Sequence, residues 1–302
     1  MINITAVKKM FTLALVGLLV LSASTFALAQ TLTIVSPNYA EPQILAEAVK
    51  IIIEKNTDLQ VEHIRNFSSS TLLHAALTSG NAQMYVSYTG TQFAGVLGME
   101  VTDEWKDARK VEEYVQQEFD QRFDATWFDS FGFNNTYALV IQKDFAEEQG
   151  IESITDLKEH SPSLTIAMDS TFRERAGDGY RDLLAAYDIE FNRAVSMDYG
   201  LIYRAVQTGD VDVAVAYSTD GRIVAMNLVA LQDDQQYFPP YDPALVAANS
   251  VLDEHPEIVT LIEPLLGQID EGTIAKYNQM VDVDYEEVEV AAQALVDDLY
   301  FK

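Results

Sequence analysis

The sequence predicts an α/β protein of two lobes, with a central cleft between them and two crossings of the chain. Three observations predict this fold. Short apolar runs alternate with helical stretches, which is typical of β-α-β units with parallel strands. The alternation restarts after residue 133, so a second set of elements follows the first. A chain of 302 residues is also long enough for two domains.

The first set of elements begins with the apolar run LTIVS. Serines at the start and a glycine at the end delimit one of its helices, because serine caps helix N-termini and glycine ends helices. We expect strands over 32–36, 59–64 and 82–88, and helices over 42–56, 68–80 and 106–123.

The second set repeats the pattern and then returns to the first lobe. We expect strands over 136–143, 164–169, 211–218 and 228–234, with helices over 180–188 and 199–209. The double proline of YFPPY marks a turn before a strand over 245–249, and three helices over 255–267, 273–281 and 285–300 end the chain. The predicted first lobe is 30–133 plus 239–302, and the second is 134–238.

Charge and the N-terminal segment predict where the protein works. With 47 acidic and 19 basic residues the net charge is −28, so neither nucleic acid nor an anionic membrane is an expected partner. Residues 1–29 combine two lysines, an apolar run and the small-residue site ALA, which is typical of a cleavable signal peptide; an uncleaved anchor is the alternative. The chain has no cysteine. We therefore expect a periplasmic monomer.

Four tyrosines fall at predicted strand ends and chain crossings. They are Tyr88, Tyr137, Tyr217 and Tyr241. Ligands of such folds bind beyond the carboxyl ends of strands, so these rings are expected to meet in the cleft. One of the 15 tyrosines alone would be an ordinary half-buried residue, but four at equivalent places predict a cage. Aromatic faces attract a quaternary ammonium group, which has charge but no N–H, by roughly 0.5 to 2 kcal/mol per ring.

Four motifs carry a resemblance to a known family. YTGT (88–91), GFNNTYAL (132–139), AYSTDG (216–221) and FPPY (238–241) resemble the substrate-binding component of glycine betaine/choline/carnitine ABC transporters, in the subgroup with a four-tyrosine cage. The resemblance implies a two-lobed periplasmic binding protein fold of type II-like form. It also implies a non-enzymatic protein without cofactor or metal. Such a protein delivers a quaternary ammonium solute to an inner-membrane permease that a cytoplasmic ATPase drives.

The resemblance also implies roles for residues around the cage. Thr91 matches the hydroxyl that holds the polar end of the ligand, and Asn135 matches another pocket position. Arg175 resembles the arginine that binds a betaine carboxylate, a task that suits a planar double donor, although its motif has one extra residue here.

The first strand end departs from the family pattern. Pro37 stands where betaine binders often have a lysine, so Gln43 or Asn38 is expected to supply a neutral contact instead. A serine also precedes YTGT in place of the more usual acidic residue. These departures leave the identity of the solute open.

The sequence is also compatible with two other functions. The first is a binding protein for a different small organic cation or polar solute, which the missing lysine motivates. The second is a secreted hydrolase with paired carboxylates. No histidine pair has the spacing of a zinc-binding helix, and neither a GxSxG elbow nor a phosphate-binding loop occurs in the sequence.

Overall fold

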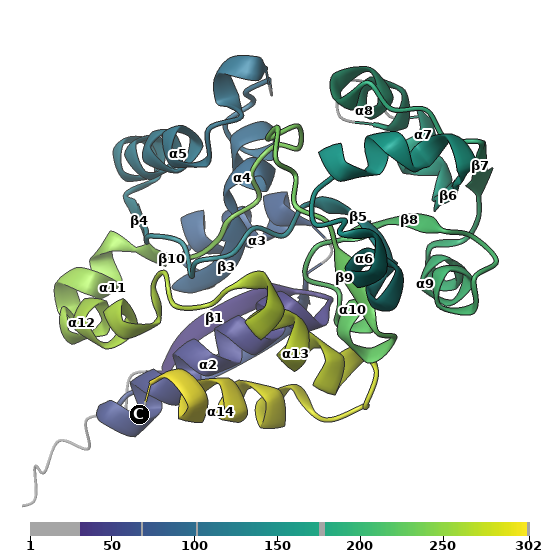
Figure 1. Ribbon diagram of the computed structural model, residues 1–302. Helices are drawn as coiled ribbons and strands as arrows, with labels where there is room; N and C mark the ends of the chain where they lie inside the picture. Colours follow the sequence, from purple (N-terminus) through teal and green to yellow (C-terminus); the bar gives the residue numbers. More distant parts are fainter. Residues whose placement is uncertain (1–30, 68, 101, 175–178, 301–302) are drawn as a thin grey trace, which may run out of the picture.

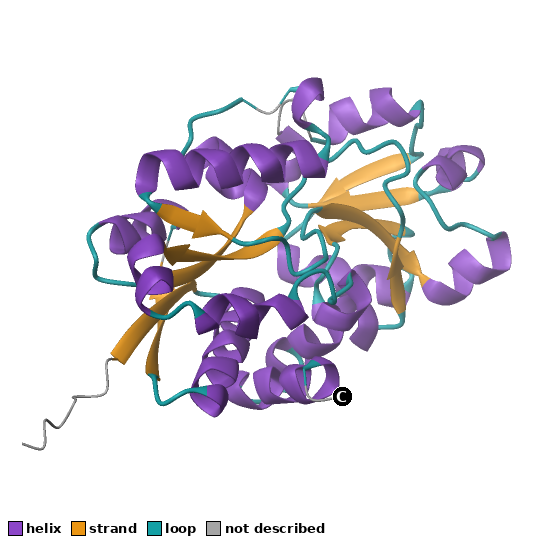
Figure 2. Cartoon of the chain, turned by 90° about the vertical axis from the view of Figure 1, so that its left-hand side faces the viewer, coloured by secondary structure: helices purple, strands orange, loops and turns teal. Residues whose placement is uncertain are grey.

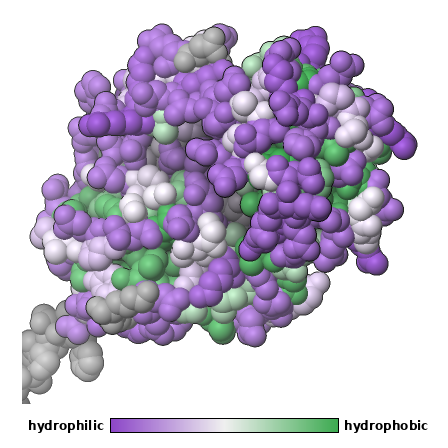
Figure 3. All heavy atoms as spheres, viewed as in Figure 1, coloured by the Kyte–Doolittle hydropathy of each residue, from purple (hydrophilic) through white to green (hydrophobic). Residues whose placement is uncertain are grey.

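The chain folds into two α/β lobes, each built on a five-stranded sheet (Figure 1). The computed structural model describes residues 31–300 apart from 68, 101 and 175–178. Helices pack around both sheets, and the face in Figure 3 is mostly hydrophilic (Figures 2 and 3). Among the described residues, none of the helices combines the length and the apolar composition of a membrane span. The predicted two-lobed α/β fold is confirmed.

The first sheet has the strand order β2-β1-β3-β10-β4. Its strands are β1 (Thr31–Pro37), β2 (Gln60–Phe67), β3 (Met84–Tyr88), β4 (Ala125–Trp127) and β10 (Pro243–Ala248). Strands β1, β2 and β3 are parallel, as their alternation with helices predicts. Strand β10 is antiparallel to β3 and β4 because the chain re-enters this sheet at the end where β3 finishes.

Eight α-helices belong to the described part of the first lobe. They are α2 (Ala40–Asn56), α3 (Ser70–Thr78), α4 (Thr89–Gly95), α5 (Ala108–Phe123), α11 (Asn249–Glu254), α12 (Glu257–Ile262), α13 (Glu271–Asp282) and α14 (Val288–Leu299). Helix α2 is buried along most of its length because α12, α13 and α14 cover it while its other side packs on the sheet. The predicted cap of α3 is Ser69, whose side chain accepts a hydrogen bond from the Leu72 amide.

The second sheet has the order β7-β6-β8-β5-β9. Its strands are β5 (Tyr137–Gln142), β6 (Thr165–Met168), β7 (Arg193–Ser196), β8 (Val213–Tyr217) and β9 (Leu228–Ala230). Strands β6, β7 and β8 are parallel, whereas β5 is antiparallel to β8 and β9. The helices are α6 (Lys143–Gln149), α7 (Ser170–Glu174), α8 (Tyr180–Tyr187), α9 (Tyr199–Thr208) and α10 (Gly221–Ala225).

Several short elements were not predicted from the sequence. These are β4, β7, α4, α6, α7, α10 and α11, none longer than seven residues. Such segments show too few repeats of the helix or strand period to be recognised. Helix α4 matters most, because it begins immediately after Tyr88 and turns the YTGT motif into a helix start.

Two crossing segments connect the sheets and lie side by side. The chain leaves the first sheet after β4 and returns to it at β10, through residues 128–136 and 231–242. The amide of Asn135 donates to the Tyr241 carbonyl at 3.2 Å, and the Tyr241 amide donates to Oδ1 of Asn134 at 2.7 Å. These bonds fix the backbone of both crossings where they pass between the lobes.

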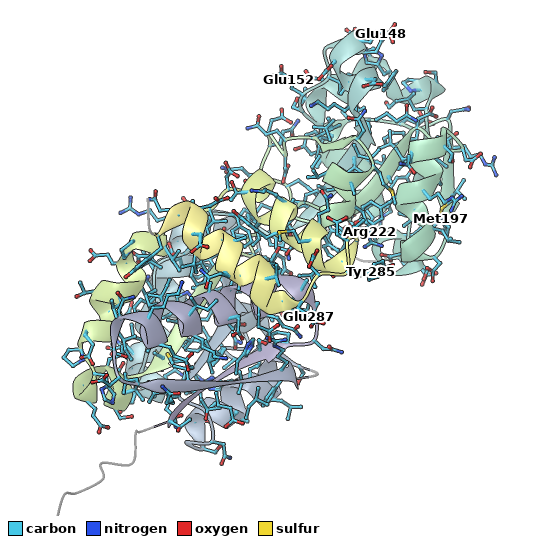
Figure 4. The ribbon with its side chains drawn as sticks, turned by 90° about the horizontal axis from the view of Figure 1, so that it is seen from below. Glu148, Glu152, Met197, Arg222, Tyr285 and Glu287 are labelled. Atoms are coloured by element: carbon cyan, nitrogen blue, oxygen red, sulfur yellow. The ribbon has the colours of Figure 1, made fainter. Side chains whose placement is uncertain are left out.

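A third contact joins the lobes without a chain crossing. Helix α13 of the first lobe packs against α10 of the second, near Arg222 in Figure 4. The Asn278 side chain donates to the Thr219 carbonyl at 2.8 Å, across this contact. A Cβ at Gly221 would lie 2.3 Å from the Gln279 amide nitrogen, so only glycine permits this approach.

A buried polar network links α2 to the first two strands. Ser36 Oγ lies 2.8 Å from Nε2 of His63, and Nδ1 of His63 lies 2.7 Å from Oε2 of Glu47. Lys50 and Arg65 pair with the same glutamate at 3.0 and 3.1 Å. The order of contacts resembles a serine hydrolase triad, but Ser36 is 0% exposed and cannot meet a substrate. The network is therefore structural.

This network predicts the acid sensitivity of the fold. Burial disfavours the charged form of Glu47, but hydrogen bonds from His63 and Lys50 and their charges prevail and lower its pKa to about 2. Because its pKa is lowered on folding, the Glu47 carboxylate stabilises the folded protein. This stabilisation is complete at pH values above 4.5, the pKa of the unfolded state, and is lost as the pH falls from there towards 2. At about 1.4 kcal/mol per pKa unit, this contribution is roughly 3 kcal/mol.

We expect Glu47→Gln to be less stable than the wild type by about 2 to 3 kcal/mol at pH 7. The difference should shrink as the pH falls to 3, because the wild-type carboxylate is then progressively protonated on unfolding. Urea denaturation of both proteins at pH 7, 5 and 3 measures this. A difference that stays constant over this range would contradict the assignment.

Candidate ligand-binding pocket

A pocket of about 540 Å³ lies where the two lobes meet. Residues of both lobes and of both crossings line it: Tyr39, Glu41, Tyr88, Thr91, Asn135, Thr136, Tyr137, Tyr217, Thr219, Asp220, Arg222, Tyr241, Asn278 and Asp282. The four tyrosines expected from the sequence are all in this lining, as are Thr91 and Asn135. The described residues contain no group of three or more histidines and carboxylates that could hold a metal ion.

Strand register brings two of these tyrosines together in the second lobe. Tyr217 ends β8 and Tyr137 begins β5, and the antiparallel pairing places them opposite each other. Their rings stack with centroids 5.1 Å apart and planes 24° apart. Tyr137 is buried against Phe172, whereas Tyr217 is 39% exposed. Tyr217 therefore keeps ring surface available to a ligand.

An antiparallel return strand also places Tyr88 and Tyr241 in the same pocket lining. Tyr88 ends β3 and pairs with Pro243, two residues after Tyr241, because β10 runs antiparallel to β3. Gly90 lies beneath the Tyr241 ring, since a Cβ on this glycine would come within 3.0 Å of the ring and 2.5 Å of the Pro240 carbonyl oxygen. The return strand of each sheet thus explains why residues far apart in sequence line one pocket.

Tyr39 is a fifth aromatic residue of the pocket and was not predicted from the sequence. It precedes α2 at the N-cap position, and its ring stacks on that of Tyr88 with centroids 6.3 Å apart. It is 46% exposed. Like Tyr88 and Tyr217, it follows a parallel strand at its carboxyl end, so the same rule applied to the VSPNYAE stretch would have found it.

Glu41 is a buried carboxyl residue of the pocket lining. It is 3% exposed and accepts hydrogen bonds from Tyr88 Oη and Asn135 Nδ2 at 2.8 Å each, and from Asn278 Nδ2 at 2.9 Å. Burial raises its pKa, and hydrogen bonds, including one from Thr219, only partly oppose this. This residue was not predicted from the sequence, and its partner Asn278 is 237 positions away.

Asp220 and Arg222 form an ion pair at the edge of the second lobe. Nε of Arg222 donates to Oδ1 of Asp220 at 2.9 Å and Nη2 donates to Oδ2 at 2.5 Å. Burial works against the Asp220 charge, but the guanidinium prevails and lowers the pKa of this carboxyl. The positive charge of Arg222 is thus matched by a carboxylate of the protein. The Cζ atom of Arg222 also lies 4.1 Å from the centroid of the Tyr203 ring.

Two residues expected at the site, Gln43 and Asn38, are not among the described residues that line the pocket. The Gln43 amide donates to the Pro37 carbonyl at 3.0 Å, so it holds the turn after β1 and does not face the pocket. Asn38 is exposed on that same turn. Arg175 lies outside the described residues.

Two α/β lobes with a ligand-sized pocket between them are typical of solute-binding proteins of the periplasmic binding protein class. Residues 30–298 match the family described as the substrate binding domain of ABC-type glycine betaine transport systems. The chain belongs to this family, which confirms the resemblance that its four motifs carry.

Individual relatives cover nearly the same part of the chain. The chain is 39% identical over 254 residues to the carnitine transport binding protein OpuCC of Listeria monocytogenes, spanning 84% of this chain and 82% of that protein. It is 33% identical over 276 residues to a glycine-betaine-binding protein of Pseudomonas aeruginosa, spanning 87% and 86%. A solved structure described as a glycine betaine/carnitine/choline ABC transporter matches with a TM-score of 0.84 and 37% identity, covering 88% of this chain and 98% of that one.

Proposed function

We propose that this protein captures a quaternary ammonium compatible solute in the pocket between its lobes and presents it to the permease of an ABC importer. The observation that carries the proposal is the set of five tyrosines lining a single pocket of about 540 Å³. Family membership supports it independently.

The chemistry of the lining suits a methylated ammonium group. Its methyl groups gain by contact with aromatic carbon, and its charge gains roughly 0.5 to 2 kcal/mol from each ring face. Tyr137 and Tyr217 come from the second lobe, whereas Tyr39 and Tyr88 come from the first. A ligand held between them contacts both lobes, so binding favours the closed arrangement over the open one.

The place and partners of the protein follow from the same proposal. The signal peptide of residues 1–29 would be removed on export, and the mature protein would act as a periplasmic monomer. Its lobes would be residues 30–133 plus 239–302, and 134–238. The expected partner is an inner-membrane permease with its cytoplasmic ATPase, and the protein itself carries out no reaction.

Thermal shift and calorimetry with purified protein test the proposal. Glycine betaine, choline and carnitine are compared with glycine and ethanolamine, which lack the methyl groups. We expect stabilisation of about 2.7 kcal/mol when a cognate ligand is present at 100 times its Kd. The unmethylated compounds should give little or none. The proposal fails if no methylated ammonium compound stabilises the protein.

A further inference from the structure

Helices α13 and α5 cover opposite faces of the first sheet. Successive residues of a strand point to opposite faces of its sheet. Val86 of β3 shares one apolar cluster with α13, whereas Tyr85 shares another with α5. In Figure 1, α5 accordingly lies above the strands of this sheet and α13 lies below them. The first lobe can therefore contact the second lobe on either side.

The second sheet is covered on both faces in the same way. On β8, Ala214 belongs to the apolar cluster of α10, and the next residue, Val215, belongs to the cluster of Tyr237. Helix α10 packs against α13 of the first lobe. Tyr237, on the other face, lies close to Lys106, which precedes α5. The two lobes thus touch on both sides of their sheets.

Backbone atoms make the contact between α10 and α13. A Cβ at Gly221 would lie 2.3 Å from the amide nitrogen of Gln279, and the Asn278 side chain donates to the Thr219 carbonyl at 2.8 Å. Packed backbones move as rigid segments, because no rotation of a side chain can separate them. We therefore expect this contact to stay in place when the lobes move, so that it can serve as a pivot.

A flexible side chain makes the contact on the other side. The Nζ atom of Lys106 lies 5.4 Å from the centroid of the Tyr237 ring. An aromatic ring attracts a cation that lies within about 6 Å of its centroid. The lysine ammonium is carried on a flexible four-carbon stem, so this contact can form and break without strain in the backbone.

Both partners of this contact are anchored in their own lobes. Trp105, next to Lys106, packs its ring against that of Phe93 with centroids 4.9 Å apart. Tyr237 is 5% exposed, and its hydroxyl donates to the Gly179 carbonyl at 2.9 Å. The distance between the ammonium and the ring therefore depends on how the two lobes are placed relative to each other.

We propose that Lys106 and Tyr237 form a latch that holds the lobes together, while the contact of α10 and α13 on the opposite side is the pivot. Neither latch residue lines the pocket, so the latch acts on the equilibrium between open and closed lobes and does not act on the ligand. A ligand that contacts both lobes binds more tightly when the closed arrangement is more populated. This inference goes beyond the proposed function, because it holds for any solute that the lobes enclose.

Distances between spin labels test the latch in the ligand-free protein. The chain has no cysteine, so Glu113→Cys on α5 and Glu148→Cys on α6 introduce the labelling sites, and both positions are exposed. Lys106→Gln removes the charge but keeps a polar side chain. We expect Lys106→Gln to shift the distribution of distances between the labels towards longer values. An unchanged distribution would overturn the inference.

Calorimetric titration with glycine betaine, choline and carnitine is the second test. Lys106→Gln should weaken the binding of each solute that the wild type binds by the same factor, about threefold, which corresponds to roughly 0.7 kcal/mol. The factor is shared because the lysine does not touch the solute. Unchanged affinities would overturn the latch, and so would a loss confined to one solute, since that would place Lys106 at the ligand.

Lys276→Gln is the matched control. Its Nζ atom lies 4.9 Å from the centroid of the Tyr277 ring and 3.1 Å from Oδ2 of Asp298, and all three residues belong to the first lobe. The same substitution there removes the same charge and a lysine–tyrosine contact within one lobe. Label distances and affinities should both stay those of the wild type, and changes equal to those of Lys106→Gln would overturn the latch. If no methylated compound binds, the proposed function fails, whereas the label distances still decide the latch.

Discussion

Tyr217→Ala should weaken binding of a quaternary ammonium solute by tenfold or more, which corresponds to about 1.4 kcal/mol. Of the two tyrosines that the second lobe contributes, Tyr217 is 39% exposed, whereas Tyr137 is buried. Removal of the ring takes away one cation–π contact and also uncovers the Tyr137 face to water. Calorimetric titration of both proteins with the best ligand of the series measures the loss.

Two variants separate the ring from other effects at this position. Tyr217→Phe keeps the aromatic face and should bind within about threefold of the wild type, or roughly 0.7 kcal/mol. Tyr285→Ala removes a tyrosine that is 87% exposed and outside the pocket lining, so the affinity for the solute should not change. Unchanged affinity of Tyr217→Ala would mean that the rings do not enclose the ligand.

The positions of the four tyrosines could be predicted from the sequence because the signal is local. A buried strand such as VAVAY ends in an aromatic residue and then becomes polar, and parallel strands end at the same edge of a sheet. The antiparallel return strands could not be predicted in this way. They bring Tyr137 opposite Tyr217 and pair Tyr88 with Pro243, two residues after Tyr241, and this pairing depends on contacts between distant segments.

The polar part of the pocket could not be predicted, for a related reason. Glu41, Asn278 and Asp282 belong to the first and the penultimate of the described α-helices, and nothing in either stretch alone indicates a shared site. A buried carboxylate that is stabilised by neutral donors has no motif, whereas an ion pair on one helix has a spacing. Gln43 and Asn38 were selected for their proximity to Pro37, but the turn there uses the Gln43 amide for its own carbonyl.

The structural role of Gly221 is visible only in the folded protein. In the sequence it is the last residue of AYSTDG, where a glycine is typical of a turn. In the structure it lies where α10 packs against α13 between the lobes. A Cβ there would lie 2.3 Å from N and 2.5 Å from Cα of Gln279, and 2.8 Å from the Asn278 carbonyl carbon. All three are backbone atoms, so a side-chain rotation cannot relieve the overlap.

Gly221→Ala should therefore push α10 away from α13 and lengthen the Asn278–Thr219 hydrogen bond, which is 2.8 Å in the wild type. Overpacking of this kind costs about 1 to 3 kcal/mol. We expect this loss in urea denaturation, together with at least tenfold weaker solute binding, because Thr219 and Asn278 both line the pocket. A variant that lost stability but bound as tightly as the wild type would show that the junction of α10 and α13 does not position the site.

Gly272→Ala is the matched control on the same helix. It lies in the first turn of α13, where an added Cβ would come no closer than 3.7 Å to Oδ1 of Asp270. Alanine is favoured over glycine in helices by roughly 0.5 to 1 kcal/mol, so this variant should be as stable as the wild type or slightly more stable. Its affinity should not change. The contrast isolates the contact between the lobes, because both variants add one methyl group and only Gly221→Ala adds it where two backbones meet.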